Sequence, residues 1–215
     1  SITFLFAMWP EIDEPGLEST KPFKFKNSDG IEIHGYFTNA RNQDQNSLPP
    51  LVVLPHGGPI GPSDDWSFDP DVHMLSNAGY AVMKVNYRGS GGYGRDFLRA
   101  GLGQAGGDIQ DDIIEATEWV IDKGWVDKQR VGIYGGSFGG YSAAMAPMLR
   151  PDLFKAGVAY VGVFDLNLNQ EVGDVRRMYF GKAQLAQIYG PDEETRAQMS
   201  PVNNVSKLEA PLLIV

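Results

Sequence analysis

One short stretch, Gly135-Gly136-Ser137-Phe138-Gly139-Gly140, limits the folds open to this chain more than any other feature. The residues before it, Arg130–Tyr134, predict a short strand, and the small residues Ser142–Ala146 after it predict a helix. A serine between glycines at such a junction is typical of a sharp turn that raises the hydroxyl above a sheet. The sequence therefore places Ser137 at an exposed corner between a strand and a helix.

Ser137 is the candidate nucleophile at this corner. The flanking glycines occupy positions where a side chain would collide with neighbouring backbone. The helix that starts directly after Ser137 points its unpaired N–H groups toward it, so the Phe138 amide can donate to an oxyanion. The alternative is a purely structural glycine-rich turn, which the strand before and the helix after argue against.

The remaining sequence alternates strand and helix patterns. Strands are predicted over Leu51–Leu54, Ala81–Tyr87, Lys155–Val163 and Pro211–Val215, and helices near Asp69–Asn77 and from Asp108 to Gly124. The second helix has a stripe of Ile109, Ile113, Thr117 and Val120, and Asp108 is its expected N-cap. Strands that alternate with helices imply right-handed crossovers and a mostly parallel sheet, so the fold class is α/β.

The first part of the chain predicts an antiparallel hairpin. Apolar and polar residues alternate in Phe23–Lys26 and again in Ile31–Phe37, with Asp29-Gly30 between them. Asp-Gly readily adopts the positive φ angles of a tight two-residue turn. The acidic, proline-containing segment Pro10–Lys21 predicts a linker.

Composition excludes several classes of function. The chain has 215 residues and a net charge of −9, with scattered Lys and Arg, so no nucleic-acid partner is expected. No run approaches the roughly 20 apolar residues of a membrane helix, so no membrane partner is expected. There is no cysteine and no paired-histidine spacing, so we expect no metal and no cofactor. A cytoplasmic and a periplasmic location remain equally open.

A second glycine-containing motif, Leu54-Pro-His-Gly-Gly-Pro59, follows a predicted strand. A strand end of this kind supplies the second oxyanion donor in folds with such a serine corner, and Gly58 is the expected donor. We expect His56 to bond its own loop rather than to act as a base, because the base follows the serine in this fold. His34 and His73 are expected to be surface or packing residues.

Three motifs in this order carry a resemblance to a known family: the serine corner, His56-Gly-Gly-Pro59 and Asn86-Tyr-Arg-Gly-Ser-Gly-Gly-Tyr-Gly94. With them, the chain resembles the catalytic domain of the prolyl oligopeptidase family, in its acylaminoacyl-peptidase or dipeptidyl-peptidase-like branch. The resemblance runs from Asp29 to Val215. It implies an α/β-hydrolase fold and a serine peptidase that cleaves short peptides or acyl-peptides through an acyl-enzyme. Ser137 would be the nucleophile, and the amides of Phe138 and Gly58 the oxyanion hole.

The resemblance also implies catalytic residues and a domain that are not in this sequence. The triad Asp and His of the family would follow Val215, and a β-propeller would precede Ser1. Residues 1–21 would then be a linker and residues 22–215 a partial catalytic domain, truncated before its last strand and helix. We therefore expect the isolated chain to be inactive and its last strand to expose a sheet edge that invites self-association.

The substrate pocket and the reaction class leave alternatives open. In the family, the region near Asp165–Phe180 helps to line the pocket, so Phe164, Met178 and Tyr179 could form an apolar wall, or could simply pack in the core. A carboxylesterase or dienelactone-hydrolase-like enzyme shares the serine corner. A dinucleotide-binding domain would use Gly89-x-Gly91-x-x-Gly94, but Arg95–Gly107 is too glycine-rich for the helix that such a site requires.

Overall fold

The computed structural model describes residue 3 and residues 16–41, 46–190 and 192–215, so most of the linker predicted over residues 1–21 lies outside the described residues. Its strands are β1 Thr20–Lys26, β2 Glu32–Thr38, β3 Leu51–Val53, β4 Ala81–Asn86, β5 Val131–Gly136, β6 Ala156–Tyr160 and β7 Leu212–Ile214. Strand β1 thus begins two residues before the expected domain boundary at residue 22.

The helices follow the strands in alternation. They are α1 Pro70–Asn77, α2 Arg95–Ala100, α3 Asp108–Asp122, α4 Phe138–Leu149, α5 Leu166–Val172, α6 Gly181–Tyr189 and α7 Glu193–Gln198. Short 3₁₀ turns occupy Val175–Arg177, Pro201–Asn203 and Val205–Lys207. No helix within the described ranges combines the length and the apolar character needed to cross a bilayer.

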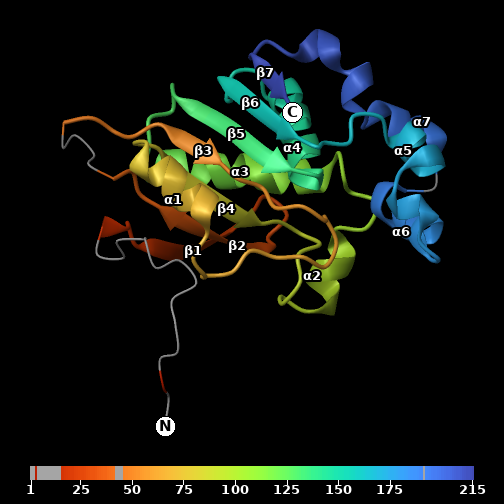
Figure 1. The fold of residues 1–215 in the computed structure, drawn as a ribbon, viewed down its shortest axis with the longest axis horizontal. Helices are drawn as coiled ribbons and strands as arrows, with labels where there is room; N and C mark the ends of the chain where they lie inside the picture. Colours follow the sequence, from red (N-terminus) through yellow and green to blue (C-terminus); the bar gives the residue numbers. More distant parts are fainter. Residues whose placement is uncertain (1–2, 4–15, 42–45, 191) are drawn as a thin grey trace.

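Seven strands form one sheet in the order β1-β2-β4-β3-β5-β6-β7. The β1–β2 and β2–β4 pairs are antiparallel, and all pairs from β4 to β7 are parallel. Helix α1 lies on the front of the sheet in Figure 1, α3 and α4 lie behind it, and α5, α6 and α7 gather beyond the strand ends. The predicted α/β class and the N-terminal antiparallel hairpin are confirmed.

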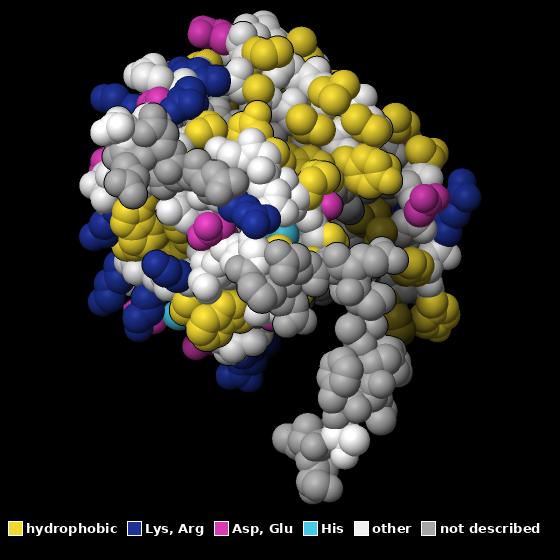
Figure 2. Space-filling model, turned by 60° about the vertical axis from the view of Figure 1, so that its left-hand side comes forward, with side chains coloured by type: hydrophobic (Ala, Val, Ile, Leu, Met, Phe, Trp, Pro, Cys, Tyr) yellow, Lys and Arg dark blue, Asp and Glu magenta, His cyan; other side chains and the backbone are white. Residues whose placement is uncertain are grey.

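The core forms where sequence patterns place apolar side chains. The predicted stripe on α3 is buried completely, and all six residues of β4 are buried. Hydrophobic side chains also gather on part of the surface in Figure 2. A groove of about 810 Å³ lies beside α1 and exposes parts of β3, β5 and β6, including Val52 and Val158.

Three local predictions differ from the structure. The hairpin turn is wider than two residues: Asn27 and Ile31 bond across it, and only Gly30 has a positive φ, of 77°. Asp108 is the first residue of α3 rather than its cap, because its carboxylate bonds Arg88 Nη1 at 2.6 Å. A six-residue helix, α2, does form in the glycine-rich segment after Gly94, since the glycines lie at its ends rather than inside it.

Candidate active site

Ser137 lies between the end of β5 and the start of α4, at the corner that the sequence predicts. Its φ of 57° and ψ of −117° are unusual for a residue with a side chain and cost about 1–3 kcal/mol. A hydrogen bond of 2.9 Å from the Ser137 amide to the Tyr160 carbonyl oxygen holds this conformation. Ser137 is exposed while Phe138 is buried, so the turn presents the serine at the carboxyl end of the sheet.

The glycines around Ser137 are needed because backbone approaches from two sides. A Cβ at Gly135 would lie 2.5 Å from the Gly139 carbonyl carbon, and one at Gly139 would overlap the Pro55 carbonyl oxygen. The Pro55–Gly58 loop is therefore pressed against the serine turn. This close packing explains the run of small residues that the sequence shows there.

The two predicted oxyanion donors belong to the segments that flank Ser137. Phe138 is the first residue of α4, so its amide has no partner inside the helix. A Cβ added to Gly57 would lie 3.6 Å from the Ser137 Cβ, which puts the peptide unit between Gly57 and Gly58 beside the serine. Gly58 itself is exposed and has a φ of 135°.

His56 bonds its own loop, as expected from the sequence. Its Nδ1 lies 2.7 Å from the Gly57 carbonyl oxygen, and its Nε2 lies 2.9 Å from the Ser90 hydroxyl. The ring stacks on Tyr87, with 4.3 Å between the centroids. Burial lowers the pKa of His56 to about 4, so the imidazole is neutral at neutral pH.

The other two histidines also have partners away from Ser137. His34 on β2 stacks on Tyr93 at 4.5 Å, and His73 on α1 stacks on Phe68 at 5.0 Å. In the part of the chain that the structure describes, which includes all three histidines, none hydrogen-bonds to the Ser137 hydroxyl. Each of the three histidines thus has its observed contacts with residues other than Ser137.

The three residues proposed for the apolar wall differ in burial. Met178 and Tyr179 are 64% and 95% exposed, so the alternative that they simply pack in the core is wrong. Phe164 instead packs against the hydrophobic core, and its ring lies against Gly162. The next residue along, Phe180, was not singled out from the sequence.

Phe180 lines a cavity of about 440 Å³ at the same end of the sheet as Ser137. Its other lining residues are Ile60, Leu102, Ala183, Gln184, Gln187 and Ile188. Ile60 is two residues beyond Gly58, so this cavity, with both apolar and glutamine side chains in its wall, adjoins the loop that carries the predicted donor. No periodic pattern in the sequence indicates this cavity, because its wall comes from three segments far apart in the chain.

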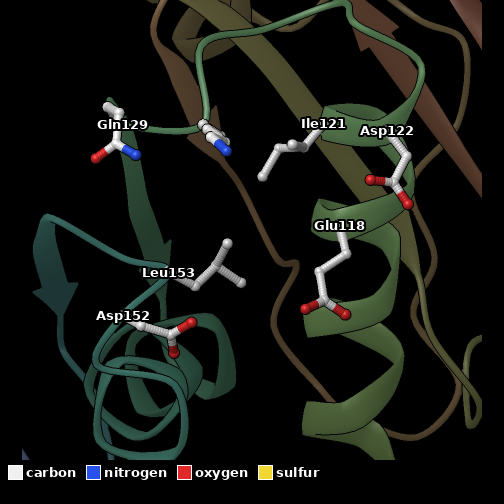
Figure 3. Close-up of a pocket in the computed structure, with 7 residues that line it drawn as sticks. Glu118, Ile121, Asp122, Gln129, Asp152 and Leu153 are labelled. Carbon is white, nitrogen blue, oxygen red and sulfur yellow. The ribbon is translucent and has the colours of Figure 1, made fainter.

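A second cavity, of about 510 Å³, lies at the opposite end of the sheet (Figure 3). Glu118 and Asp122 from α3 line it together with Asp152, and Gln129 lies just before β5 begins. Arg150 pairs with both Glu118 and Asp152 at this place. Ligands of parallel sheets bind at the carboxyl ends of the strands, so this polar cavity is a poor candidate for the active site.

The loop after Gly58 is fixed by charged and polar groups that the sequence did not reveal. Asn86, fully buried at the end of β4, bonds both the amide and the carbonyl oxygen of Asp64, at 2.8 and 3.0 Å. Buried Lys84 lies 3.8 Å from the Asp64 carboxylate and 3.2 Å from that of Asp69. Burial raises the pKa of Asp64 to about 7.

Comparison with known proteins decides the family. Residues 66–215 match the Prolyl oligopeptidase family. The chain belongs to this family. It is 35% identical over 227 residues to dipeptidyl aminopeptidase BIII of Pseudoxanthomonas mexicana, a match that covers the whole chain and 32% of that protein.

Solved structures of peptidases share the fold of this chain. A puromycin-hydrolyzing peptidase of Mycobacterium tuberculosis superposes with a TM-score of 0.86 and 29% identity, over 94% of this chain and 31% of that one. An acylaminoacyl peptidase in complex with Z-Gly-Gly-Phe-chloromethyl ketone superposes with a TM-score of 0.82 and 28% identity, over 92% of this chain and 32% of that one. These relatives confirm the α/β-hydrolase fold, and the chain spans about a third of their length.

Proposed function

We propose that Ser137 is the nucleophile of a serine peptidase that cleaves short peptides or acyl-peptides. The observation that carries this proposal is the strained, exposed conformation of Ser137 at the end of β5, since such a turn has a cost that only a function explains. The Phe138 and Gly58 amides would hold the oxyanion of the tetrahedral intermediate.

The base and its carboxylate partner would come from polypeptide outside these 215 residues. This part of the proposal rests on the positions of His34, His56 and His73, each with partners other than Ser137. The external imidazole would take the Ser137 hydroxyl proton as the oxygen attacks the carbonyl carbon, and give it to the leaving amine. Water would then release the acyl group from Ser137.

The cavity beside Ile60 and Phe180 would receive an apolar substrate side chain. The apolar side chains of Ile60, Leu102 and Ile188 in its wall, and its position next to the Gly58 loop, support this assignment. Exposed Met178 and Tyr179 lie next to Phe180 in the chain and would extend the same wall, and Phe164 would support it from the core side. A relative of the same fold has been solved with a reagent that ends in Phe.

The proposal predicts a preference for peptides over esters in the full-length enzyme. We expect hydrolysis of an acyl-dipeptide anilide with an apolar P1 residue, and the Ser137→Ala variant should lose at least about 10⁴-fold in kcat. A comparison of kcat/KM for matched peptide and ester substrates is the test. An enzyme that hydrolyses only the esters would be a carboxylesterase or dienelactone-hydrolase-like enzyme instead.

We further propose that the isolated chain self-associates through β7. Leu213 and Ile214 are each 59% exposed, and β7 pairs on one side only within the described sheet. An unpaired apolar strand is a template for another strand. Size-exclusion chromatography should therefore show oligomers that Leu213→Lys reduces, whereas a monomer at high concentration would contradict the proposal.

A further inference from the structure

The segment that follows β4, Asn86-Tyr-Arg-Gly-Ser90, supports the loop that carries Gly58. The Gly61 amide donates to the Gly89 carbonyl oxygen at 2.9 Å. The Tyr87 hydroxyl donates to the His56 carbonyl oxygen at 2.8 Å. The segment therefore determines where the loop backbone lies, and its last residue, Ser90, reaches the His56 ring.

The contacts of His56 decide which of its nitrogens carries the proton. Nδ1 lies 2.7 Å from the Gly57 carbonyl oxygen, which can only accept, and 3.0 Å from the Tyr87 hydroxyl, which can donate to the His56 carbonyl oxygen at 2.8 Å instead. A proton on Nδ1 satisfies these contacts, so we assign Nδ1 as the donor to Gly57. A neutral imidazole has one proton, and its Nε2 is then an acceptor. The hydroxyl of Ser90, 2.9 Å from Nε2, can supply the matching donor.

The Ser90 hydroxyl could instead donate to the Tyr87 carbonyl oxygen, 2.7 Å away. That oxygen already accepts the Ser90 amide at 3.0 Å, so it does not depend on the hydroxyl proton. Nε2 of His56 has no other hydrogen-bonding partner among the described residues. Ser90 is completely buried, so water does not replace its hydroxyl, and the proton is best placed on the bond to His56.

The His56–Gly57 bond fixes a peptide unit beside the nucleophile. In a trans peptide the C=O of Gly57 and the N–H of Gly58 point in opposite directions. An imidazole that holds the Gly57 oxygen on one side therefore turns the Gly58 N–H to the other. We infer that Ser90 is a positioning residue for the Gly58 amide and acts on it through the His56 ring. This inference rests on the proposed role of Gly58 as an oxyanion donor.

The test compares two buried serines in the full-length enzyme. Ser90→Ala should lower kcat about tenfold, less than the 10²–10³-fold of a lost oxyanion donor, and leave KM within twofold. Ser76→Ala is the matched control, because Ser76 is buried like Ser90 and its hydroxyl donates to a carbonyl oxygen, that of Asn39, at 2.7 Å, but hydrogen-bonds to no histidine among the described residues. Ser76→Ala should leave both constants within twofold. Equal kcat values for the two variants would overturn the inference.

A double-mutant cycle separates positioning from loss of folding. If Ser90 acts through the ring, then Ser90→Ala added to His56→Ala should change kcat less than twofold further, and Ser90→Thr should restore most of the rate. Multiplicative losses in the double variant would contradict the inference. A wild-type enzyme without peptidase activity would refute the proposed function, whereas an active wild type with an unimpaired Ser90→Ala variant refutes only the role of Ser90.

Discussion

At the scale of the single residue, Asp64 is the most unusual group in the loop beyond Gly58. Its side chain is only 14% exposed, and its buried Oδ2 atom has no hydrogen-bond partner among the residues that the structure describes. The nearest cation, Lys84, is shared with Asp69, which it approaches more closely. Desolvation therefore outweighs the attraction of Lys84 and raises the pKa of Asp64 to about 7.

This raised pKa predicts that Asp64 weakens the fold as pH rises. Between about pH 4 and 7 the unfolded chain has released this proton while the folded chain still holds it, so stability falls across that window. The full effect corresponds to about 4 kcal/mol. Asp64→Asn cannot ionise, so the variant should gain up to this amount over wild type from pH 4 to 8 in denaturant unfolding.

The difference in unfolding free energy between wild type and the Asp64→Asn variant isolates the effect of Asp64, because all other titrating groups are present in both proteins. His56, with a pKa lowered to about 4, has the opposite effect on stability between about pH 4 and 6.5, but it does so in both proteins. A difference in unfolding free energy that does not change with pH would show that Asp64 is ionised in the folded state.

At the scale of the element, a buried ion pair joins three parts of the fold. Asp112 on α3 accepts from the Arg88 side chain and backbone, each at 2.9 Å, and from Asn27 of the hairpin turn at 2.7 Å. Arg88 also reaches Asp29 and Asp108. These contacts give Arg88 a structural role.

Removing Asp112 should destabilise the chain much more than breaking a surface pair. Asp112→Ala leaves the buried Arg88 charge short of its main partner, so we expect a loss of about 3–5 kcal/mol in unfolding free energy. The control is Asp152→Ala, which breaks an exposed pair with Arg150 and should cost less than about 1 kcal/mol. Similar losses in both variants would mean that the Arg88 cluster stabilises little.

The secondary structure was predictable wherever one residue pattern decided it. The apolar stripe on α3 and the apolar run of β4 could be recognised from the local sequence alone. The spacing of apolar residues along each segment indicates both its secondary structure and its buried side chains. The width of the hairpin turn and the start of α3 were not predictable, since both depend on contacts to Asp112 and Arg88 from distant segments.

At the scale of the whole molecule, the sheet brings the serine turn and the Pro55–Gly58 loop together. Both lie at the carboxyl ends of the adjacent parallel strands β3 and β5, so the order of strands decides that they meet. The sequence identified both motifs. It could not identify the contacts that Ser90 and Asn86 make to the loop, because buried polar contacts between distant segments have no periodic signature.

Labelling of the isolated 215-residue chain by a fluorophosphonate tests the central claim most directly. The claim is that Ser137 is a nucleophile whose base lies outside this sequence. Loss of a triad histidine lowers kcat about a millionfold because the serine is no longer activated, so the account predicts no labelling of Ser137 above that of a Ser137→Ala control over hours. Rapid labelling of Ser137 in the isolated chain would contradict it and would mean that these residues supply a base of their own.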